Sequence, residues 1–206
     1  GMGTMSMLWA LNGVDINAVD LNPTSIDQTS KRFELRGLKG DIRQADANAL
    51  PFDDSAFDYA YSWGVLHHSP DLEKSLSEMM RVLKPGGGFG IMLYNRRSFW
   101  QWYVTEYIEG FLHFENNFLS PLELASRYGD GYREEGNPHT WPVTEDEMKS
   151  MLGPYSDDLK FRIFGTELDS VFRTMLPGIG LFVPKIVKKA WARRYGWSLW
   201  MHGRKK

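Results

Sequence analysis

The first 95 residues alternate short apolar runs with amphipathic stretches. Apolar runs bounded by turn residues predict strands, and apolar residues three or four positions apart predict helices. The pattern predicts strands at 16–20, 42–45, 56–62 and 89–94, and helices at 4–11, 23–37 and 71–84. Strands and helices that alternate in this way form a parallel sheet with right-handed crossovers. The sequence therefore predicts an α/β fold with a doubly wound, mostly parallel sheet.

Residues 96–150 break this rhythm and predict a helical and loop insertion. Aromatic residues recur there at helical spacing, and both Ser120–Glu123 and Thr144–Glu147 have the spacing of a helix capping box. The stretch 128–141 is rich in Gly, Asn, Pro and charge, which predicts an ordered loop or lid. Ligands bind such sheets beyond the carboxyl ends of the strands, so we expect the insertion to form a substrate cap. Core packing explains the aromatic residues equally well.

The last part of the chain predicts a strand at 159–167, a basic and aromatic helical segment at 170–195, and a final strand at 197–202 that runs antiparallel to its neighbour. No acidic residue follows Asp169, whereas nine basic residues do: Arg173, Lys185, Lys188, Lys189, Arg193, Arg194, Arg204, Lys205 and Lys206. This segment is either an ordinary solvated helix face or a surface for peripheral contact with anionic lipid.

Composition narrows the classes of protein. With 206 residues, of which 42% are hydrophobic, the chain can bury one sizeable core, so we expect a single domain over 1–206. No cysteine is present, which excludes disulfides and cysteine-ligated metal, and the histidines show no ligand spacing with carboxylates. No apolar run approaches the roughly 20 residues that span a bilayer. A net charge of −2 gives no argument for nucleic acid. We expect a cytoplasmic protein with a small-molecule substrate and no metal.

A nucleotide-binding pattern opens the chain. Gly1 and Gly3 precede a helix, and the next strand ends in Asp20. A glycine turn allows close approach of backbone to a ligand, and an acid at the end of the next strand accepts the hydroxyl groups of a ribose. Because a short glycine turn before a helix is often simple punctuation, this signal alone is weak.

Five blocks in order carry a family resemblance. They are GMG at 1–3, VDLNP at 19–23, DANALPF at 46–52, FDYAYSWGVLHHSPD at 57–71 and RVLKPGGG at 81–88. This series resembles the class I methyltransferases that use S-adenosylmethionine, within the small-molecule group related to quinone and sterol methyltransferases. The resemblance is close over residues 1–95. It implies a Rossmann-like sheet in which the strand at 89–94 is the fifth, with the helical insertion after it.

The resemblance also implies roles for residues. Asp20 would accept the ribose hydroxyls, Asp46 would bond the exocyclic amine of adenine, and His68 would lie near the sulfonium. The implied contacts of S-adenosylmethionine are Gly1, Gly3, Asp20, Leu21, Asp46, Ala47, Ser62, Trp63, Gly64 and His68. The glycines of 86–88 would form a structural turn.

One part of the family pattern is missing. Enzymes of this family have a first strand that ends in an acid, followed by the first glycine of the turn, and the chain begins after both. We therefore expect an N-terminally truncated enzyme that is less stable than its family and binds the cofactor weakly, because neighbouring strands would keep unpaired backbone groups.

The expected chemistry is methyl transfer to a small hydrophobic or aromatic acceptor. The cofactor carries the activation, so the protein mainly positions donor and acceptor. A base is useful for a hydroxyl, amine or acidic carbon, and His67 and His68 are the candidates because they follow the strand at 56–62. Further candidate contacts for the substrate are Tyr94, Asn95, Tyr128, Tyr132 and His139.

Two other functions stay open. A nicotinamide dehydrogenase shares the glycine turn and the strand-end acid, but Ser6 stands where the last glycine of GxGxxG would lie, and DANALPF and LKPGGG would be unexplained. A binding protein that keeps the methyltransferase fold without catalysis is the second alternative. Retention of Asp20 and Asp46 argues against it.

Overall fold

The computed structural model describes residues 1–129, 137–165 and 182–206. Tyr132 lies outside these ranges, as do parts of the predicted loop at 128–141, the strand at 159–167 and the segment at 170–195. The chain forms two compact units, residues 1–53 and residues 54–206, and each is described by itself. The expectation of a single domain stays a prediction.

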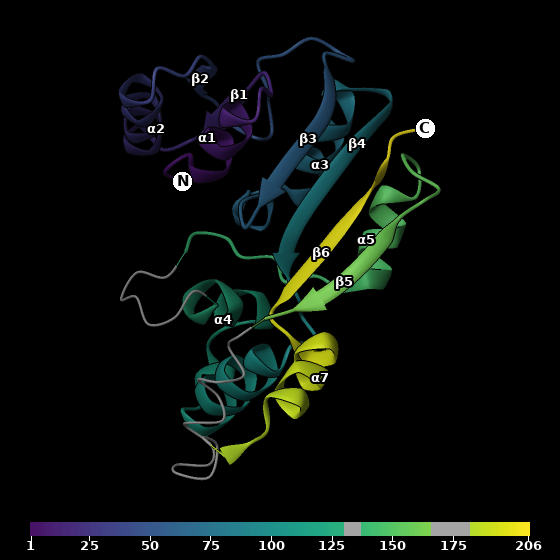
Figure 1. The fold of residues 1–206 in the computed structure, drawn as a ribbon. Helices are drawn as coiled ribbons and strands as arrows, with labels where there is room; N and C mark the ends of the chain where they lie inside the picture. Colours follow the sequence, from purple (N-terminus) through teal and green to yellow (C-terminus); the bar gives the residue numbers. More distant parts are fainter. Residues whose placement is uncertain (130–136, 166–181) are drawn as a thin grey trace. The chain divides into compact units, whose positions relative to one another are not determined.

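The first unit contains two strands and two helices. Its elements are α1 (Thr4–Leu11), β1 (Asn17–Asp20), α2 (Pro23–Leu35) and β2 (Asp41–Gln44), and β1 pairs with β2 in parallel (Figure 1). Asn22 begins α2, because its side chain accepts a hydrogen bond of 2.9 Å from the Thr24 amide and Pro23 follows it. All four predicted elements of this unit are confirmed, with small differences at their ends.

The second unit contains a four-stranded sheet in the order β3-β4-β6-β5. Its strands are β3 (Phe57–Trp63), β4 (Leu83–Tyr94), β5 (Lys160–Phe164) and β6 (Ser198–Arg204). β3 and β4 are parallel, whereas β6 is antiparallel to both β4 and β5. Three strands therefore run in one direction and β6 in the other. The mixed α/β fold, the mostly parallel sheet and the antiparallel final strand are confirmed.

β4 begins earlier than expected. The sequence predicts a turn at the glycines and a strand from Phe89, but β4 extends back to Leu83. The ladder explains the difference: Phe57 pairs with Leu83, yet Tyr59 pairs with Gly88, so the residues between them bulge out of register. Gly86 has a φ of +76° within this bulge. The predicted turn is therefore present as an interruption inside the β3–β4 ladder.

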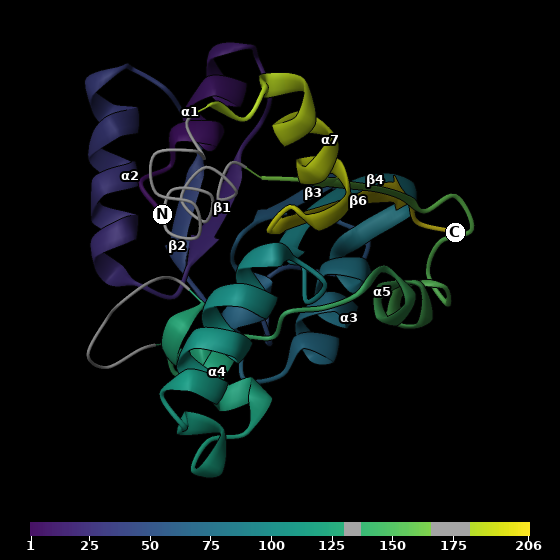
Figure 2. The same ribbon diagram turned by 90° about the horizontal axis from the view of Figure 1, so that it is seen from below.

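Helices cover one face of this sheet. α3 (Leu72–Val82) and α5 (Glu145–Leu152) lie together on the same side, as Figure 2 shows. The helical face predicted for α3 is buried, including Leu76, Met79 and Met80. Asp71 caps α3, because its carboxylate accepts a 2.9 Å hydrogen bond from the Lys74 amide. These side chains and those of the buried strand β4 form the core of the unit.

The insertion is helical, as predicted, but its first helix is unusual. Its elements are η2 (Gln101–Leu112), a π-helix, η3 (Glu115–Asn117) and α4 (Pro121–Tyr128). Both predicted capping boxes are present, at Ser120–Glu123 and Thr144–Glu147. The basic helix α7 (Lys185–Tyr195) precedes β6. Among the helices that the structure describes, none is both long and apolar enough to cross a membrane.

Candidate active site

A short 3-10 helix after β3 positions the two adjacent histidines. η1 (Leu66–His68) follows Gly64, whose φ of +66° is a conformation that glycine adopts without strain. The His67 side chain is fully buried, whereas His68 is half-buried. The sequence predicted both as candidate bases, and the structure gives them different surroundings.

His67 lies within an aromatic stack. Its ring centroid is 4.1 Å from that of His68 and 3.9 Å from that of Tyr94, and Tyr94 packs on Trp197 at 4.4 Å. Neither ring nitrogen of His67 has a hydrogen-bond partner in the described part of the chain. Burial, and then the neighbouring His68, lower the pKa of His67 well below its ordinary value. His67 is therefore neutral at physiological pH.

His68 is held through one ring nitrogen. Its Nδ1 lies 3.0 Å from the carbonyl oxygen of His139 and 3.3 Å from Oγ1 of Thr140. A carbonyl oxygen only accepts, and the Thr140 hydroxyl donates to the same His139 oxygen at 2.9 Å. Nδ1 therefore carries the proton, and Nε2 of the neutral ring carries the basic lone pair. The sequence predicted His139 as a contact of the substrate. In the structure, its backbone carbonyl contacts His68.

Trp141 and Trp197 are parts of this site that the sequence analysis missed. The Trp141 indole donates a 2.8 Å hydrogen bond to the carbonyl oxygen of Ser69, and the Trp141 amide donates one of 2.8 Å to that of His67. These bonds hold the segment at 139–141 against η1. Trp141 belongs to the predicted loop at 128–141, but a tryptophan in a polar loop gave no sign of its partner.

Asn95 and Tyr128 have structural contacts. The side-chain amide of Asn95 donates a 2.9 Å hydrogen bond through Nδ2 to the Gly196 carbonyl, and its Oδ1 accepts one of 3.0 Å from the Arg97 backbone amide. Asn95 therefore fixes the exit of β4. The Tyr128 hydroxyl donates to Glu115 at 2.6 Å, and burial together with that carboxylate raises the pKa of Tyr128. Their predicted contacts with the substrate stay predictions.

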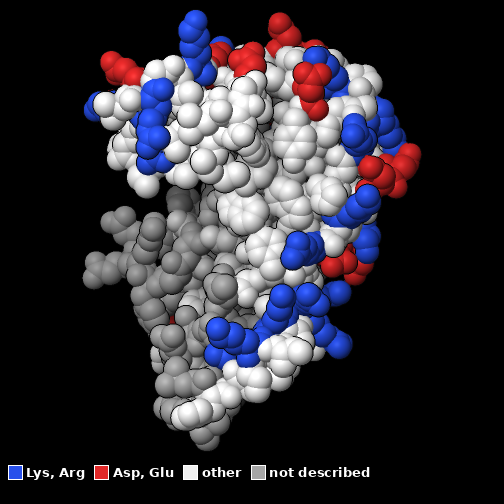
Figure 3. Space-filling model, viewed as in Figure 1, with Lys and Arg blue, Asp and Glu red and all other residues white. Residues whose placement is uncertain are grey.

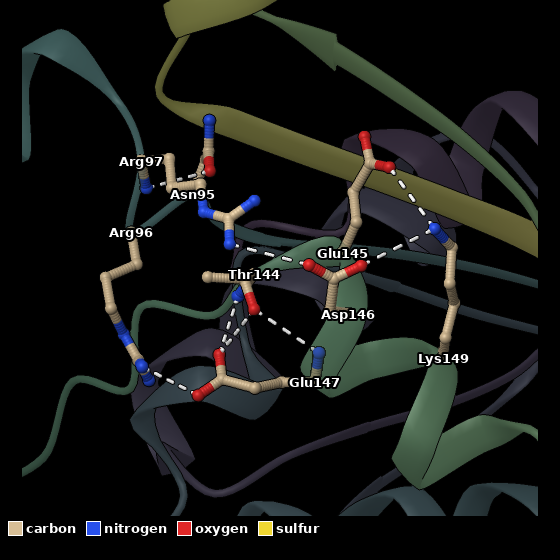
Figure 4. Close-up of polar contacts among 8 residues, drawn as sticks. All are labelled: Asn95, Arg96, Arg97, Thr144, Glu145, Asp146, Glu147 and Lys149. Carbon is tan, nitrogen blue, oxygen red and sulfur yellow. Dashed lines mark hydrogen bonds and ion pairs between the residues drawn. The ribbon is translucent and has the colours of Figure 1, made fainter.

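The exit of β4 is tied to the start of α5 (Figure 4). Arg96 forms a 2.6 Å ion pair with Glu147, which also accepts a 2.8 Å hydrogen bond from the Thr144 amide. Burial raises the pKa of Glu147, but the bonds from Thr144 and the charge of Arg96 outweigh it and lower the pKa overall. The loop that follows the carboxyl end of the strand is thus fixed where this class of sheet binds ligands.

A cleft of about 530 Å³ opens beside this exit. Its walls combine aromatic rings with charged groups: Arg96, Arg97, Ser98, Phe99, Trp102, Glu106, Trp191 and Tyr195. Phe99 and Trp191 meet edge to face, with ring centroids 6.0 Å apart, and join η2 to α7. An apolar cleft with a few polar groups is typical of a small-molecule site.

The first unit holds the glycine turn and two predicted acids. Gly3 has a φ of +65°, and a Cβ at this position would lie 2.3 Å from Cγ2 of Thr29, so only glycine fits. The Gly1 amino group donates a hydrogen bond to Asp20, which also accepts one of 2.9 Å from the Asn22 amide. An acid that accepts from N–H groups here also suits the hydroxyls of a ribose.

Other predicted cofactor contacts also suit a nucleotide with an amino acid tail. Asp46 is exposed at the end of β2 and accepts a 2.9 Å hydrogen bond from the Asn48 amide, with Ala47 between them. Leu21 is 66% exposed beside Asp20, which leaves an apolar surface for an adenine ring. In the second unit, the buried Ser62 hydroxyl has no partner within the described ranges, and Trp63 beside it is 45% exposed. A polar ligand group would satisfy that hydroxyl.

Comparison with known families decides the class of domain. The profile of the methyltransferase domain matches residues 1–91, which include every residue of the predicted cofactor set. Residues 1–91 therefore resemble the methyltransferase domain family. S-adenosylmethionine is the expected cofactor of this domain, and the resemblance to class I methyltransferases is confirmed.

Two curated proteins are similar to part of this chain in sequence. A phthiotriol/phenolphthiotriol dimycocerosates methyltransferase of Mycobacterium leprae is 37% identical over 87 residues, 42% of this chain and 32% of that protein. An uncharacterized protein of Mycobacterium bovis is 31% identical over 99 residues, 48% of this chain and 36% of its own length. The chain thus spans about a third of the curated relatives it matches.

A solved structure shows the fold over the full chain. An S-adenosylmethionine-dependent methyltransferase of Methanosarcina mazei superposes with a TM-score of 0.63 at 20% identity, over 100% of this chain and 88% of that one. At this identity the likeness concerns the fold alone. The fold beyond residue 91 is therefore also like that of this solved structure.

Proposed function

We propose that the protein transfers a methyl group from S-adenosylmethionine to a small hydrophobic acceptor. The observation that carries the proposal is the methyltransferase-domain match over residues 1–91, which includes Gly3, Asp20 and Asp46. The bound cofactor supplies an activated methyl group on its sulfonium. The chain's own residues then need to bind, orient, exclude water and, for an acidic acceptor, take up a proton.

The first unit would bind the nucleoside part of the cofactor. Asp20 would accept hydrogen bonds from the ribose hydroxyls, and Asp46 would accept one from the exocyclic amine of adenine, since both carboxylates lie at the carboxyl ends of parallel strands. Gly3 would keep the backbone of the turn open to the ligand, because any side chain there collides with Thr29. Exposure of Leu21 supports an apolar contact with the base.

In the second unit, His68 is the candidate base. Its Nδ1 proton is directed to the His139 carbonyl, which orients the ring, so Nε2 is the nitrogen that would take up a proton from the acceptor. His67 does not suit this role, since its ring is fully buried and its pKa is well below the ordinary value. Tyr94 packs against both rings and fixes their positions.

Two observations support a hydrophobic acceptor. The cleft beside the exit of β4 is walled by Phe99, Trp102, Trp191 and Tyr195, and its volume of about 530 Å³ suits a small molecule. A relative that is 37% identical over 87 residues bears the name of a phthiotriol dimycocerosates methyltransferase. An apolar acceptor would gain about 25 cal/mol for each Å² that it buries against such walls.

The test is methyl transfer itself. The protein is incubated with S-adenosylmethionine labelled in the methyl group and a panel of quinols, sterols, fatty acids and polar amines, and the label is measured in each product. We expect transfer to apolar acceptors only. Transfer to the polar amines alone would overturn the acceptor class. Binding of S-adenosylhomocysteine without transfer to any acceptor would favour a non-catalytic protein of the same fold.

A further inference from the structure

The outer face of α7 combines exposed positive charge with exposed apolar side chains. Lys185, Lys189, Arg193 and Arg194 are all exposed, and the helix contains no acidic residue. At 100° per residue, Ile186 lies between these four side chains on the same side of the helix. Ile186 is 78% exposed. This outer basic face is unlike the charged faces of α2 and α5, which carry acids among their bases.

No acid in the described ranges neutralises the face. Lys185, Lys189, Arg193 and Arg194 form no ion pair with any described residue. Figure 3 shows Lys and Arg side chains gathered over α7, with apolar surface beside them. Phe182, at the start of this segment, is 84% exposed and adds a large ring. Exposed basic and apolar side chains on one face suit an anionic partner that also offers apolar groups.

We infer that the outer basic face of α7 docks the protein on an anionic lipid bilayer. A basic amphipathic helix lies in the interface of a membrane with its apolar side chains inserted and its cations among the headgroups. Each Lys or Arg near an anionic surface contributes on its own, and the sum falls with salt. Double-stranded nucleic acid would attract the cations but offers nothing to Ile186 and Phe182, so the bilayer fits better.

Packing of the opposite side of α7 holds the face outward. Trp191 meets Phe99 of η2, and Trp191 and Tyr195 line the cleft beside the exit of β4. The cleft and the outer basic face therefore share one helix. A protein docked through α7 would have this cleft close to the membrane surface. The docking itself does not depend on methyl transfer.

Co-sedimentation with vesicles tests the inference. The full chain is mixed with vesicles of phosphatidylcholine, or of phosphatidylcholine with phosphatidylglycerol, at low and high salt. We expect binding only to the anionic vesicles, and less at high salt. The variant Lys189→Glu/Arg193→Glu should bind on the order of tenfold more weakly. Ile186→Asn, which leaves the net charge unchanged, should also bind more weakly because it removes an apolar side chain.

The matched control is Arg36→Glu/Lys39→Glu, which makes the same change of charge on exposed residues of the first unit. It should bind as the unchanged protein does, and circular dichroism should show that all variants are folded. The inference is overturned by equal binding of the α7 variant and the unchanged protein, or by no binding to anionic vesicles. It is also overturned by binding to duplex DNA that is as tight as binding to the vesicles. Loss of methyl transfer without loss of sedimentation would bear on the proposed function only.

Discussion

His67 and His68 show how far neighbouring residues of one type can differ in chemistry. The sequence predicted both as bases because they follow a strand of the sheet. The 3-10 geometry of η1 buries the first ring against Tyr94 and turns the second toward the His139 carbonyl. This difference could not be predicted, because it depends on Tyr94 and His139, which are far away along the chain.

His68→Gln tests the assignment of the base. Removal of a general base lowers turnover by roughly 10²–10⁴-fold, so turnover with saturating S-adenosylmethionine should fall by this order. Affinity for S-adenosylhomocysteine, measured by titration calorimetry, should change much less. His202→Gln is the matched control, at an exposed position of β6, and should keep turnover. Unchanged turnover in His68→Gln would remove this residue from the mechanism.

His67 should make folding stability depend on pH. Its pKa is lowered in the folded state, so below the ordinary value of 6.5 the unfolded chain binds a proton that the folded chain does not. Stability therefore falls as pH falls. The free energy of unfolding should decrease by about 1.4 kcal/mol between about pH 7.5 and about pH 5.5 through this group.

His67→Phe should remove this part of the pH dependence, because phenylalanine keeps a ring and does not titrate. Urea unfolding of both proteins at the two pH values measures the difference. His202→Gln should behave as the unchanged protein, since His202 is exposed. If the free energy of unfolding fell equally between the two pH values in His67→Phe and in the unchanged protein, that result would contradict a neutral buried His67.

Helices with local signals could be predicted from the sequence, and elements that depend on distant partners could not. Ser120–Glu123 and Thr144–Glu147 are capping boxes as predicted, because every atom of such a cap comes from four consecutive residues. The bulge before Phe89 depends instead on how β4 pairs with β3. The π-helical form of η2 likewise has no signature in the spacing of its aromatic residues.

Glu147→Ala should destabilise the protein more than Asp146→Ala, although the two acids are neighbours. Glu147 closes the capping box of α5 and pairs with Arg96 at 2.6 Å, whereas Asp146 is 68% exposed and lies 3.4 Å from Arg97. We expect a loss of about 1–2 kcal/mol for Glu147→Ala and at most about half as much for Asp146→Ala. Chemical denaturation measures both, and equal losses would contradict the stabilising contribution of the capping box and of the ion pair with Arg96.

At the scale of the molecule, the direction of the strands could be predicted where local pattern sets it. Alternating strands and helices predicted parallel strands, and the pairs β1–β2 and β3–β4 are parallel. The division into residues 1–53 and 54–206 was not predicted, because it reflects where contacts are few and no change of composition marks it. The predicted cofactor residues fall in both units, so their roles stay predictions that a binding experiment must test.

Thermal unfolding with nucleotides is the experiment that separates the candidate functions of the whole protein. A ligand that binds only the folded state stabilises it by about 2.7 kcal/mol at a concentration of 100 times its Kd. S-adenosylmethionine and S-adenosylhomocysteine should therefore raise the unfolding temperature, and NAD should not. Asp20→Ala should weaken the effect, because it removes the carboxylate proposed to accept hydrogen bonds from the ribose hydroxyls. The control Asp27→Ala changes an exposed acid that pairs with Lys31 and should leave the effect unchanged. A shift by NAD alone would indicate a dehydrogenase, and equal shifts in the two variants would exclude Asp20 from the cofactor site.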